Sequence, residues 1–455
     1  MPIADDILVD AAPEAIRLRP VSAGAADLPR FAQATGFTGA SGTICPLPDA
    51  DGAVSEVLAG VGDGTDRWAF AAIADALPAG TYALSAPLEP DAATDAAVAW
   101  LLAGYTFSRY RTTAEVPHRA RLVWPDGARR DDALSLARAT ALLRDLVNTP
   151  AADMGPADVE AAARALAESR GATVESIVGD ALLDRHFPAI HAVGRAATAA
   201  RAPRLIDLRW GDHTAPRVTI VGKGVCFDSG GLDIKPASAM KLMKKDMGGA
   251  AHALGLAALI MDAGLPVRLR VLIPAVENAV SAESFRPGDV LPTRKGLTIE
   301  VNNTDAEGRI ILADALAEAD SESPAVLIDF ATLTGAARVA LGPDLPALFS
   351  NDDTLAEALL AHGRRLDDPL WRLPLWPGYR SQIEGTVGDV DNAPEGGMAG
   401  AITAALFLEK FVSPTVPWAH IDCYAWASRA RPGRPAGAAA QGLRAAFAML
   451  RERFG

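Results

Sequence analysis

Cysteine is scarce in this chain of 455 residues, which contains only three. Cys45, Cys226 and Cys423 lie far apart in apolar surroundings, and no CxxC pair occurs. Small secreted proteins that depend on disulfides usually contain an even and larger number of closely spaced cysteines. We therefore expect no disulfide framework and a reduced, cytoplasmic compartment.

An excess of positive charge, a long apolar run and a signal peptide are also absent. The chain has 43 Lys and Arg against 56 Asp and Glu, and its net charge of −13 offers no field that would attract a nucleic-acid backbone. The longest apolar run, 248–261, contains His252 and is too short to span a bilayer. Residues 1–6 lack the basic and apolar regions of a signal peptide. We expect a soluble protein with no nucleic-acid or membrane partner.

Histidine offers no evident metal site. The chain has seven histidines and no HExxH motif. The nearest pair, His186 and His191, spans an expected loop and strand, and we interpret both residues as ordinary structural or surface histidines.

Length and hydrophobic patterning predict an α/β protein with more than one domain. A polar segment with turn signals, 124–133, indicates a boundary. We predict a smaller N-terminal α/β domain over 1–128, a linker helix over 129–147, and a larger α/β catalytic domain over 148–455. The larger domain is expected to contain a central mixed sheet flanked by helices.

Strand-like and helix-like segments alternate along the chain. The expected strands are 81–84, 188–193, 204–209, 218–221, 267–275, 297–301, 326–331 and 417–423. The expected helices are 91–102, 133–147, 156–170, 248–263, 309–319, 400–411 and 438–452.

The segment VNNTDAEGRI, 301–310, places charged residues between an expected strand and an expected helix. Asp305, Glu307 and Arg309 occupy alternate positions, so an extended backbone would direct all three side chains to one face. Thr304 and Glu307 also match the capping box Ser/Thr-x-x-Glu, which is a purely structural interpretation. Both interpretations are open at this point.

A second charged junction, 221–251, contains Lys223, Asp228, Lys235 and Asp246 and is rich in glycine. Its GKGVCF sequence lacks the third glycine of a dinucleotide-binding GxGxxG motif, and it does not match a P-loop. Its DSGG sequence resembles the surroundings of a chymotrypsin-type serine, but that fold is all-β.

Four carboxylates then remain at these junctions: Asp228, Asp246, Asp305 and Glu307. Ligands of an open α/β sheet bind at the carboxyl ends of its strands, where these residues are expected. Crowded carboxylates repel one another and cannot all ionise unless cations compensate them. Two divalent ions bridged by shared carboxylates form a known hydrolytic arrangement, and the pattern predicts such a site.

The motifs around these residues resemble the leucine aminopeptidase family, which is peptidase family M17 or the cytosol aminopeptidases. NTDAEGR at 303–309 is close to the family signature, and VGKGVCFDSGG at 221–231 and MKKDMGGAA at 243–251 resemble its metal segments. Further similar blocks are VENAV…RPGDV at 276–290, DFATLTGA at 329–336, WRLPL at 371–375 and GGMAGAITAALFLEKFV at 396–412. The resemblance covers 145–430 with specific motifs, and the N-terminal third only in general character.

The resemblance implies a role for each metal-binding side chain. Asp228 and Glu307 would bridge two divalent ions, which zinc, manganese or magnesium could supply. Lys223 and Asp246 would complete one ion. Asp305 would hold the other through its carboxylate and its main-chain carbonyl.

The resemblance also implies the reaction, which is hydrolysis of the first peptide bond of peptides with a free N-terminus. The attacking water would be activated by the two metals. Lys235 would stabilise the oxyanion, and Arg309 would hold a bicarbonate ion that serves as general base. The implied substrate-binding residues are Met243, Thr332 and Gly335 around the first side chain and Leu333 through its backbone. A homohexamer with active sites facing an interior cavity is implied as well.

The sequence departs from the family near its C-terminal end. After WAHIDCYAW, 418–426, a Gly-containing segment is shortened. Tyr424 falls where the family often has a small residue beside the side-chain pocket. The tail GAAAQGLR, 437–444, also differs, and the preferred N-terminal residue is left open.

Two other functions are compatible with parts of the pattern. A phosphoesterase or another two-metal hydrolase could use the same carboxylates, although a phosphatase would favour more basic groups than Lys235 and Arg309. A non-catalytic structural or DNA-binding homologue would be marked by lost metal ligands or a basic patch, and the sequence has neither mark.

Overall fold

The computed structural model describes residues 5–112 and 119–455. The chain divides into two compact α/β units: one is Met1–Leu142 with Ala427–Gly437, and the other is Leu143–Trp426 with Ala438–Gly455. The expected class, a smaller N-terminal α/β part followed by a larger one, is confirmed. The sequence had assigned 427–437 to the second domain, and the structure groups this segment with the first unit instead.

The first unit is built on a six-stranded sheet in the order β1-β6-β5-β2-β4-β3. Its strands are parallel except for β3, which runs antiparallel to β4 at one edge. The strands are β1 (Leu8–Val9), β2 (Ile16–Ser22), β3 (Ile44–Pro48), β4 (Val54–Gly62), β5 (Gly80–Leu84) and β6 (Ala120–Val123). The helices are α1 (Arg30–Ala34), α2 (Ala69–Ala76) and α3 (Pro90–Ala103).

The second unit contains a nine-stranded mixed sheet in the order β16-β15-β18-β14-β9-β11-β8-β7, with β10 paired to β11. Its centre, β18-β14-β9-β11, is parallel. The strands are β7 (Thr173–Val178), β8 (Arg204–Trp210), β9 (Arg217–Gly222), β10 (Gly224–Asp228), β11 (Arg268–Asn278), β14 (Val326–Ala331), β15 (Ala347–Ser350), β16 (Trp371–Arg372) and β18 (Trp418–Asp422). Shorter strands of this unit are β12 (Val290–Pro292), β13 (Thr298–Glu300) and β17 (Val390–Asp391), and β19 (Trp426–Ala427) and β20 (Gly437–Ala438) each have one residue in either unit.

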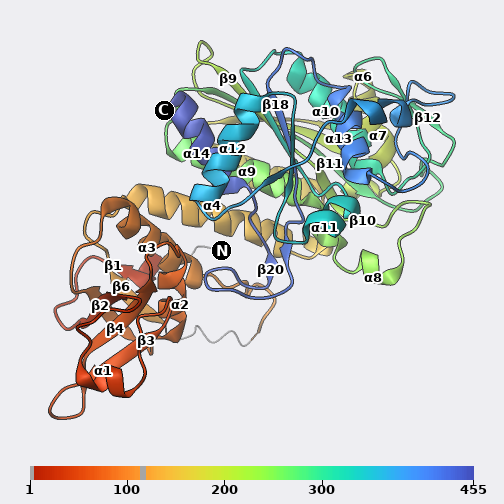
Figure 1. The fold of residues 1–455 in the computed structure, drawn as a ribbon. Helices are drawn as coiled ribbons and strands as arrows, with labels where there is room; N and C mark the ends of the chain where they lie inside the picture. Colours follow the sequence, from red (N-terminus) through yellow and green to blue (C-terminus); the bar gives the residue numbers. More distant parts are fainter. Residues whose placement is uncertain (1–4, 113–118) are drawn as a thin grey trace. The chain divides into compact units, whose positions relative to one another are not determined.

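Helices cover both faces of this sheet (Figure 1), as expected from the alternating pattern. The helices from the end of the first unit onward are α4 (Arg130–Asn148), α5 (Pro156–Glu168), α6 (Ala181–Asp184), α7 (Pro188–Gly194), α8 (Ala237–Met240), α9 (Gly248–Asp262), α10 (Glu307–Asp320), α11 (Gly335–Leu341), α12 (Asp353–Arg365), α13 (Gly400–Glu409) and α14 (Leu443–Phe454). The apolar run 248–261 forms most of α9 and is buried throughout, which explains why it is apolar on all sides.

One expected element is wrong, and one expected helix begins later than predicted. The expected strand 188–193 is the helix α7, which begins at Pro188, and the buried Asp314 carboxylate accepts hydrogen bonds from the backbone N–H groups of Ala189 and Ile190. The expected helix 438–452 begins only at Leu443, because Gly442 has φ +74° and the preceding residues are not helical.

The described part of the chain has no helix that is both long and apolar enough to cross a membrane. All three cysteines are buried and unpaired, in agreement with the expected absence of a disulfide framework.

A buried ionic contact joins two central strands of the larger sheet. Asp329 on β14 lies beside His420 on β18, and neither residue is exposed to solvent. The Asp329 carboxylate lies 2.6 Å from His420 Nδ1 and accepts a hydrogen bond of 2.7 Å from Trp418 Nε1. Burial lowers the pKa of His420, but the charge of Asp329 outweighs burial and raises this pKa above 6.5.

We expect Asp329→Asn to destabilise the protein more at low pH than at high pH. A folded-state pKa above the unfolded value stabilises the fold below about pH 6.5, and this contribution is lost as the pH rises through the folded-state pKa. Urea unfolding at about pH 6 should show a loss of roughly 2–4 kcal/mol, with a smaller loss near pH 9. An equal or larger loss near pH 9 would contradict the ion pair.

Candidate active site

The candidate site lies at the carboxyl ends of the central parallel strands, where ligands of an open α/β sheet bind. Lys223 directly follows β9, Asp228 ends β10 and Thr332 follows β14. Asp246 comes from a short 3₁₀ helix, Met243–Met247, that precedes α9. Gly230, with φ +88°, allows the chain to turn sharply after Asp228, because a Cβ there would lie 2.5 Å from a backbone carbonyl oxygen.

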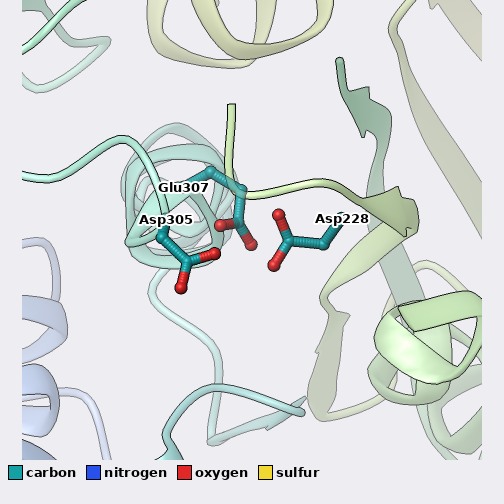
Figure 2. Close-up of side chains that lie close together, drawn as sticks. All are labelled: Asp228, Asp305 and Glu307. Carbon is teal, nitrogen blue, oxygen red and sulfur yellow. The ribbon is translucent and has the colours of Figure 1, made fainter. Parts of the chain in front are cut away.

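Three carboxylates converge at this edge, as Figure 2 shows. Asp228, Asp305 and Glu307 each offer an oxygen, and these oxygens lie within 4.8 Å of one another. Asp228 and Glu307 are almost fully buried, at 2% and 1% exposure. This distance is short enough for shared cations to bridge the three groups.

Two lysines connect the remaining predicted residues to this cluster. Lys223 Nζ lies 2.8 Å from Asp246 Oδ2 and 3.0 Å from Glu307 Oε1. Lys235 Nζ lies 2.8 Å from Asp228 Oδ2 and also pairs with Asp305. The structure therefore brings together all five residues expected to bind metal, with Lys235 beside them.

The backbone geometry of 301–310 differs from the expectation. Helix α10 begins at Glu307, so Glu307 and Arg309 lie on a helix and do not share the face of an extended segment with Asp305. The Thr304 cap is also wrong, because its hydroxyl donates to the Gly230 carbonyl and α10 has no side-chain cap. Thr304 thus connects the two charged junctions.

The pKa shifts show that the positive charge around the carboxylates is too small to keep all of them ionised. Burial, followed by the charge of Asp228, raises the pKa of Glu307 to about 8 and that of Asp305 to about 6. Burial alone would lower the pKa values of Lys223 and Lys235, but the surrounding carboxylates raise both. Additional cations would favour ionisation of the carboxylates.

The donor set fits divalent metal ions. Three buried carboxylate oxygens have a lysine ammonium as their one close partner among the described residues: Asp246 Oδ2, Asp305 Oδ1 and Glu307 Oε1. Buried oxygens with free lone pairs and negative charge are suitable ligands for magnesium, manganese or zinc.

Arg309 is buried beside this cluster and lines the same cavity. Its Nη1 donates a hydrogen bond of 2.5 Å to the backbone carbonyl of Asn392, while its buried Nε finds no hydrogen-bond acceptor among the described residues. Burial lowers the pKa of Arg309 to about 10. The group therefore stays charged near neutral pH and has donor capacity left for an anion.

The four residues expected to contact substrate lie together around one cavity of about 630 Å³. Met243, Leu333 and Gly335 line it, as do Lys235 and several metal-site residues. Thr332 lines it too, but its hydroxyl donates to Asp246 Oδ1 at 2.8 Å. Thr332 therefore also positions an expected metal ligand.

Sequence reasoning missed three residues that organise the site. The Asn278 amide, at the end of β11, donates to Asp228 at 2.9 Å and approaches Glu307 at 3.4 Å. Asn392 holds Arg309, and Asp422 accepts hydrogen bonds from the backbone N–H groups after β14. Two of the three had a visible signal, because Asn278 and Asp422 end strands at the same sheet edge.

Gly308 provides a local test of this geometry. A Cβ at Gly308 would lie 2.6 Å from Lys223 Nζ, and Lys223 is held between Asp246 and Glu307. Alanine favours a helix over glycine by about 1 kcal/mol, yet we expect Gly308→Ala to reduce kcat/KM by about 10–100-fold, as displaced metal-site supports do. The assay should be paired with metal analysis and a thermal melt. Unchanged metal content and activity would contradict this packing.

Comparison with known proteins defines the class to which this fold and site belong. Residues 141–447 match the catalytic domain of the cytosol aminopeptidase family, and residues 21–125 match the M17 aminopeptidase N-terminal domain. The chain therefore belongs to the cytosol aminopeptidase family, M17. The match to the N-terminal domain adds a specific relationship where sequence motifs had shown only general character.

Individual relatives cover nearly the whole chain. A probable cytosol aminopeptidase of Geobacter sp. (strain M21) is 38% identical over 94% of this chain and 92% of the relative. The crystal structure of the cytosol aminopeptidase from Coxiella burnetii superposes with a TM-score of 0.92 and 48% identity, covering 99% and 100% of the two chains. The bottromycin maturation enzyme BotP, in complex with Mn, superposes with a TM-score of 0.88 and 34% identity over 96% and 99%.

Proposed function

We propose that this chain is a two-metal aminopeptidase that removes the N-terminal residue from peptides with a free N-terminus. The observation that carries the proposal is the cluster of buried carboxylates at the cavity, in a chain of the cytosol aminopeptidase family. Family membership supports aminopeptidase activity, and the donor set supports its dependence on metal.

The proposed metal ligands are those predicted from the sequence. Asp228 and Glu307 would bridge two ions, Lys223 and Asp246 would complete one, and Asp305 would complete the other. The two ions, when bound, would polarise the scissile carbonyl and lower the pKa of the attacking water. Manganese or zinc fits the oxygen-rich set, and the structure of BotP is of a complex with Mn.

Two other side chains would stabilise the oxyanion and hold the general base. Lys235 lines the cavity and would stabilise the oxyanion that develops on the substrate carbonyl. Arg309 would hold a bicarbonate ion through its remaining donor, and this ion would supply a general base beside the metal site. No histidine lines the described cavity, so an external base fits the residues present.

A substrate panel with metal reconstitution tests the proposal. The protein would be stripped with a chelator, reconstituted with zinc, manganese or magnesium, and assayed on aminoacyl-p-nitroanilides. We expect metal-dependent cleavage that N-acetylation of the substrate abolishes, because the free amine is part of the recognised group. Cleavage of phosphate esters without cleavage of any aminoacyl substrate would support a phosphoesterase instead. Inactivity on both would support a non-catalytic role.

We also propose a cytoplasmic homohexamer, as the family resemblance implies. The names of the relatives and the unpaired cysteines support the cytoplasm. The second unit exposes several large apolar side chains, which are common at subunit interfaces: Val339, Trp371, Trp376, Val387 and Met398. Light scattering after size-exclusion chromatography should give a mass of six copies, and a monomer would contradict this assembly.

A further inference from the structure

A buried lysine at the cavity lies outside the proposed metal set. Lys245 is 5% exposed and lines the cavity together with Met243, Thr332 and Tyr424. Among the described residues, its ammonium donates no hydrogen bond. Its nearest carboxylate oxygen is Asp246 Oδ1, at 3.9 Å, which is beyond hydrogen-bond distance. A buried charge without a close partner is costly. A buried ammonium that lacks a hydrogen-bond acceptor therefore indicates a role in binding a ligand.

The carboxylates near Lys245 are already engaged elsewhere. Asp246 pairs with Lys223 at 2.8 Å and accepts the Thr332 hydroxyl at 2.8 Å. Asp422 accepts from the backbone N–H groups of Leu333 and Thr334 and from the Thr334 hydroxyl. Both carboxylates therefore accept hydrogen bonds from closer donors, and neither accepts one from the Lys245 ammonium.

A second cation, Arg338, lies against the same aromatic ring as Lys245. The Lys245 ammonium lies 4.9 Å from the centre of the Tyr424 ring, and the Arg338 guanidinium lies 5.0 Å from the same centre. Both cations line the cavity, and Arg338 is exposed. An aromatic ring attracts cations but adds no negative charge, so Tyr424 does not neutralise the two cations.

We propose that Lys245, supported by Arg338 and Tyr424, binds the side-chain carboxylate of an N-terminal glutamate or aspartate. The enzyme would then prefer acidic N-terminal residues, a specificity that rests on the proposed aminopeptidase function. A ligand carboxylate would form a hydrogen-bonded ion pair with the Lys245 ammonium, whereas a leucine side chain would leave the ammonium unpaired and dehydrated. The same chemistry could come from the C-terminal carboxylate of a dipeptide, and the test must separate the two sources.

The experiment compares isosteric substrates that differ in charge. The α-glutamyl and glutaminyl p-nitroanilides have side chains of nearly equal shape and no C-terminal carboxylate, and the aspartyl and asparaginyl pair repeats the comparison. We expect a kcat/KM ratio of glutamyl to glutaminyl substrate of about ten or more, which decreases with added salt. Lys245→Met should reduce the ratio to about one, and Lys245→Arg should restore most of it.

The neighbouring lysine provides a matched control. Lys244 donates a hydrogen bond to the Asn148 carbonyl and does not line the cavity. Lys244→Met should therefore leave the ratio unchanged. Because the readout is a ratio, a general loss of activity or stability in any variant does not affect it.

Each outcome is decisive. A ratio near or below one in the wild type, with leucyl substrate cleaved well, overturns the acidic preference but leaves the aminopeptidase intact. No cleavage of any aminoacyl substrate overturns the proposed function itself. If Lys245→Met instead selectively weakens cleavage of Leu-Gly relative to Leu-Gly-amide, the lysine binds the C-terminal carboxylate and the side-chain assignment is wrong.

Discussion

Replacing Glu307 by glutamine is expected to reduce kcat/KM for any cleaved aminoacyl substrate by about a thousandfold or more, which equals ~4 kcal/mol of transition-state stabilisation. The Glu307 side chain is buried at the convergence of three carboxylates. Glutamine keeps the shape of the side chain but removes one negative charge and one of its two carboxylate oxygens. A neutral amide is a weaker ligand for two adjacent dications, so metal content should decrease together with activity.

The measurement combines steady-state kinetics with metal analysis of the same samples. Glu357→Gln is the matched control, because this substitution makes the same chemical change at an exposed position of α12. The control should keep wild-type activity and metal content. A thermal melt should show that Glu307→Gln is folded. A folded Glu307→Gln protein with wild-type metal content and activity would refute the proposed bridging role.

That charged residues would gather at one sheet edge was predictable from the sequence, because Lys223, Asp228 and Asp305 each follow an expected strand. Strand ends of a parallel sheet meet at one edge, so Lys223, Asp228 and Glu307 could be expected together without knowledge of the loops. The structure places them within ion-pair distance of one another or of a shared neighbour. The extent of most helices also followed the hydrophobic period.

Features that depend on distant partners were not predictable. Helix α7 looked like a strand because its short apolar sequence is ambiguous, and its helical start is stabilised by Asp314, far away in the chain. The sequence around Thr304 favours helix capping, but in the structure the Thr304 hydroxyl donates a hydrogen bond to the backbone carbonyl of Gly230. In both cases a tertiary hydrogen bond outweighed a local preference.

The geometry of Lys245 shows the same limit at the level of function. In the sequence, Lys244 and Lys245 are adjacent and chemically identical. Only the fold shows that Lys244 donates to a backbone carbonyl outside the cavity, whereas Lys245 is buried at the cavity and donates no hydrogen bond within the described part of the chain. The proposed specificity could therefore not have been inferred from the motif that contains both residues.

Replacing Arg270 by methionine is expected to destabilise the larger unit by about 3–5 kcal/mol, because it removes one side of a buried ionic network. Arg270, on β11, is 4% exposed. It donates to Asp207 on β8 at 2.7 Å and to Glu318 on α10 at 2.6 Å, and it lies 3.2 Å from Glu322. Burial lowers the pKa of Arg270, but these carboxylates raise it, so the guanidinium stays charged. Methionine would leave these partly buried carboxylates only with their more exposed partners, such as Arg209 and Arg294.

Arg268→Met is the control for this second prediction. Arg268 lies two residues earlier on the same strand, but its side chain is 27% exposed and its carboxylate partner Glu322 is 3.7 Å away. Partly exposed pairs contribute about 0–1 kcal/mol, so its urea midpoint should be near that of the wild type. A similar small loss for Arg270→Met would show that the network is not a major source of stability.

The same network connects stability to the site through α10. This helix begins with Glu307 and Arg309 at the cavity and carries Glu318, which is held by Arg270, near its other end. Because the replacement acts at the far end of the helix, we expect Arg270→Met to lower the unfolding midpoint while kcat/KM well below that midpoint stays close to the wild-type value. A large loss of kcat/KM in the folded variant would instead show that the anchor at Arg270 sets the position of the metal ligands.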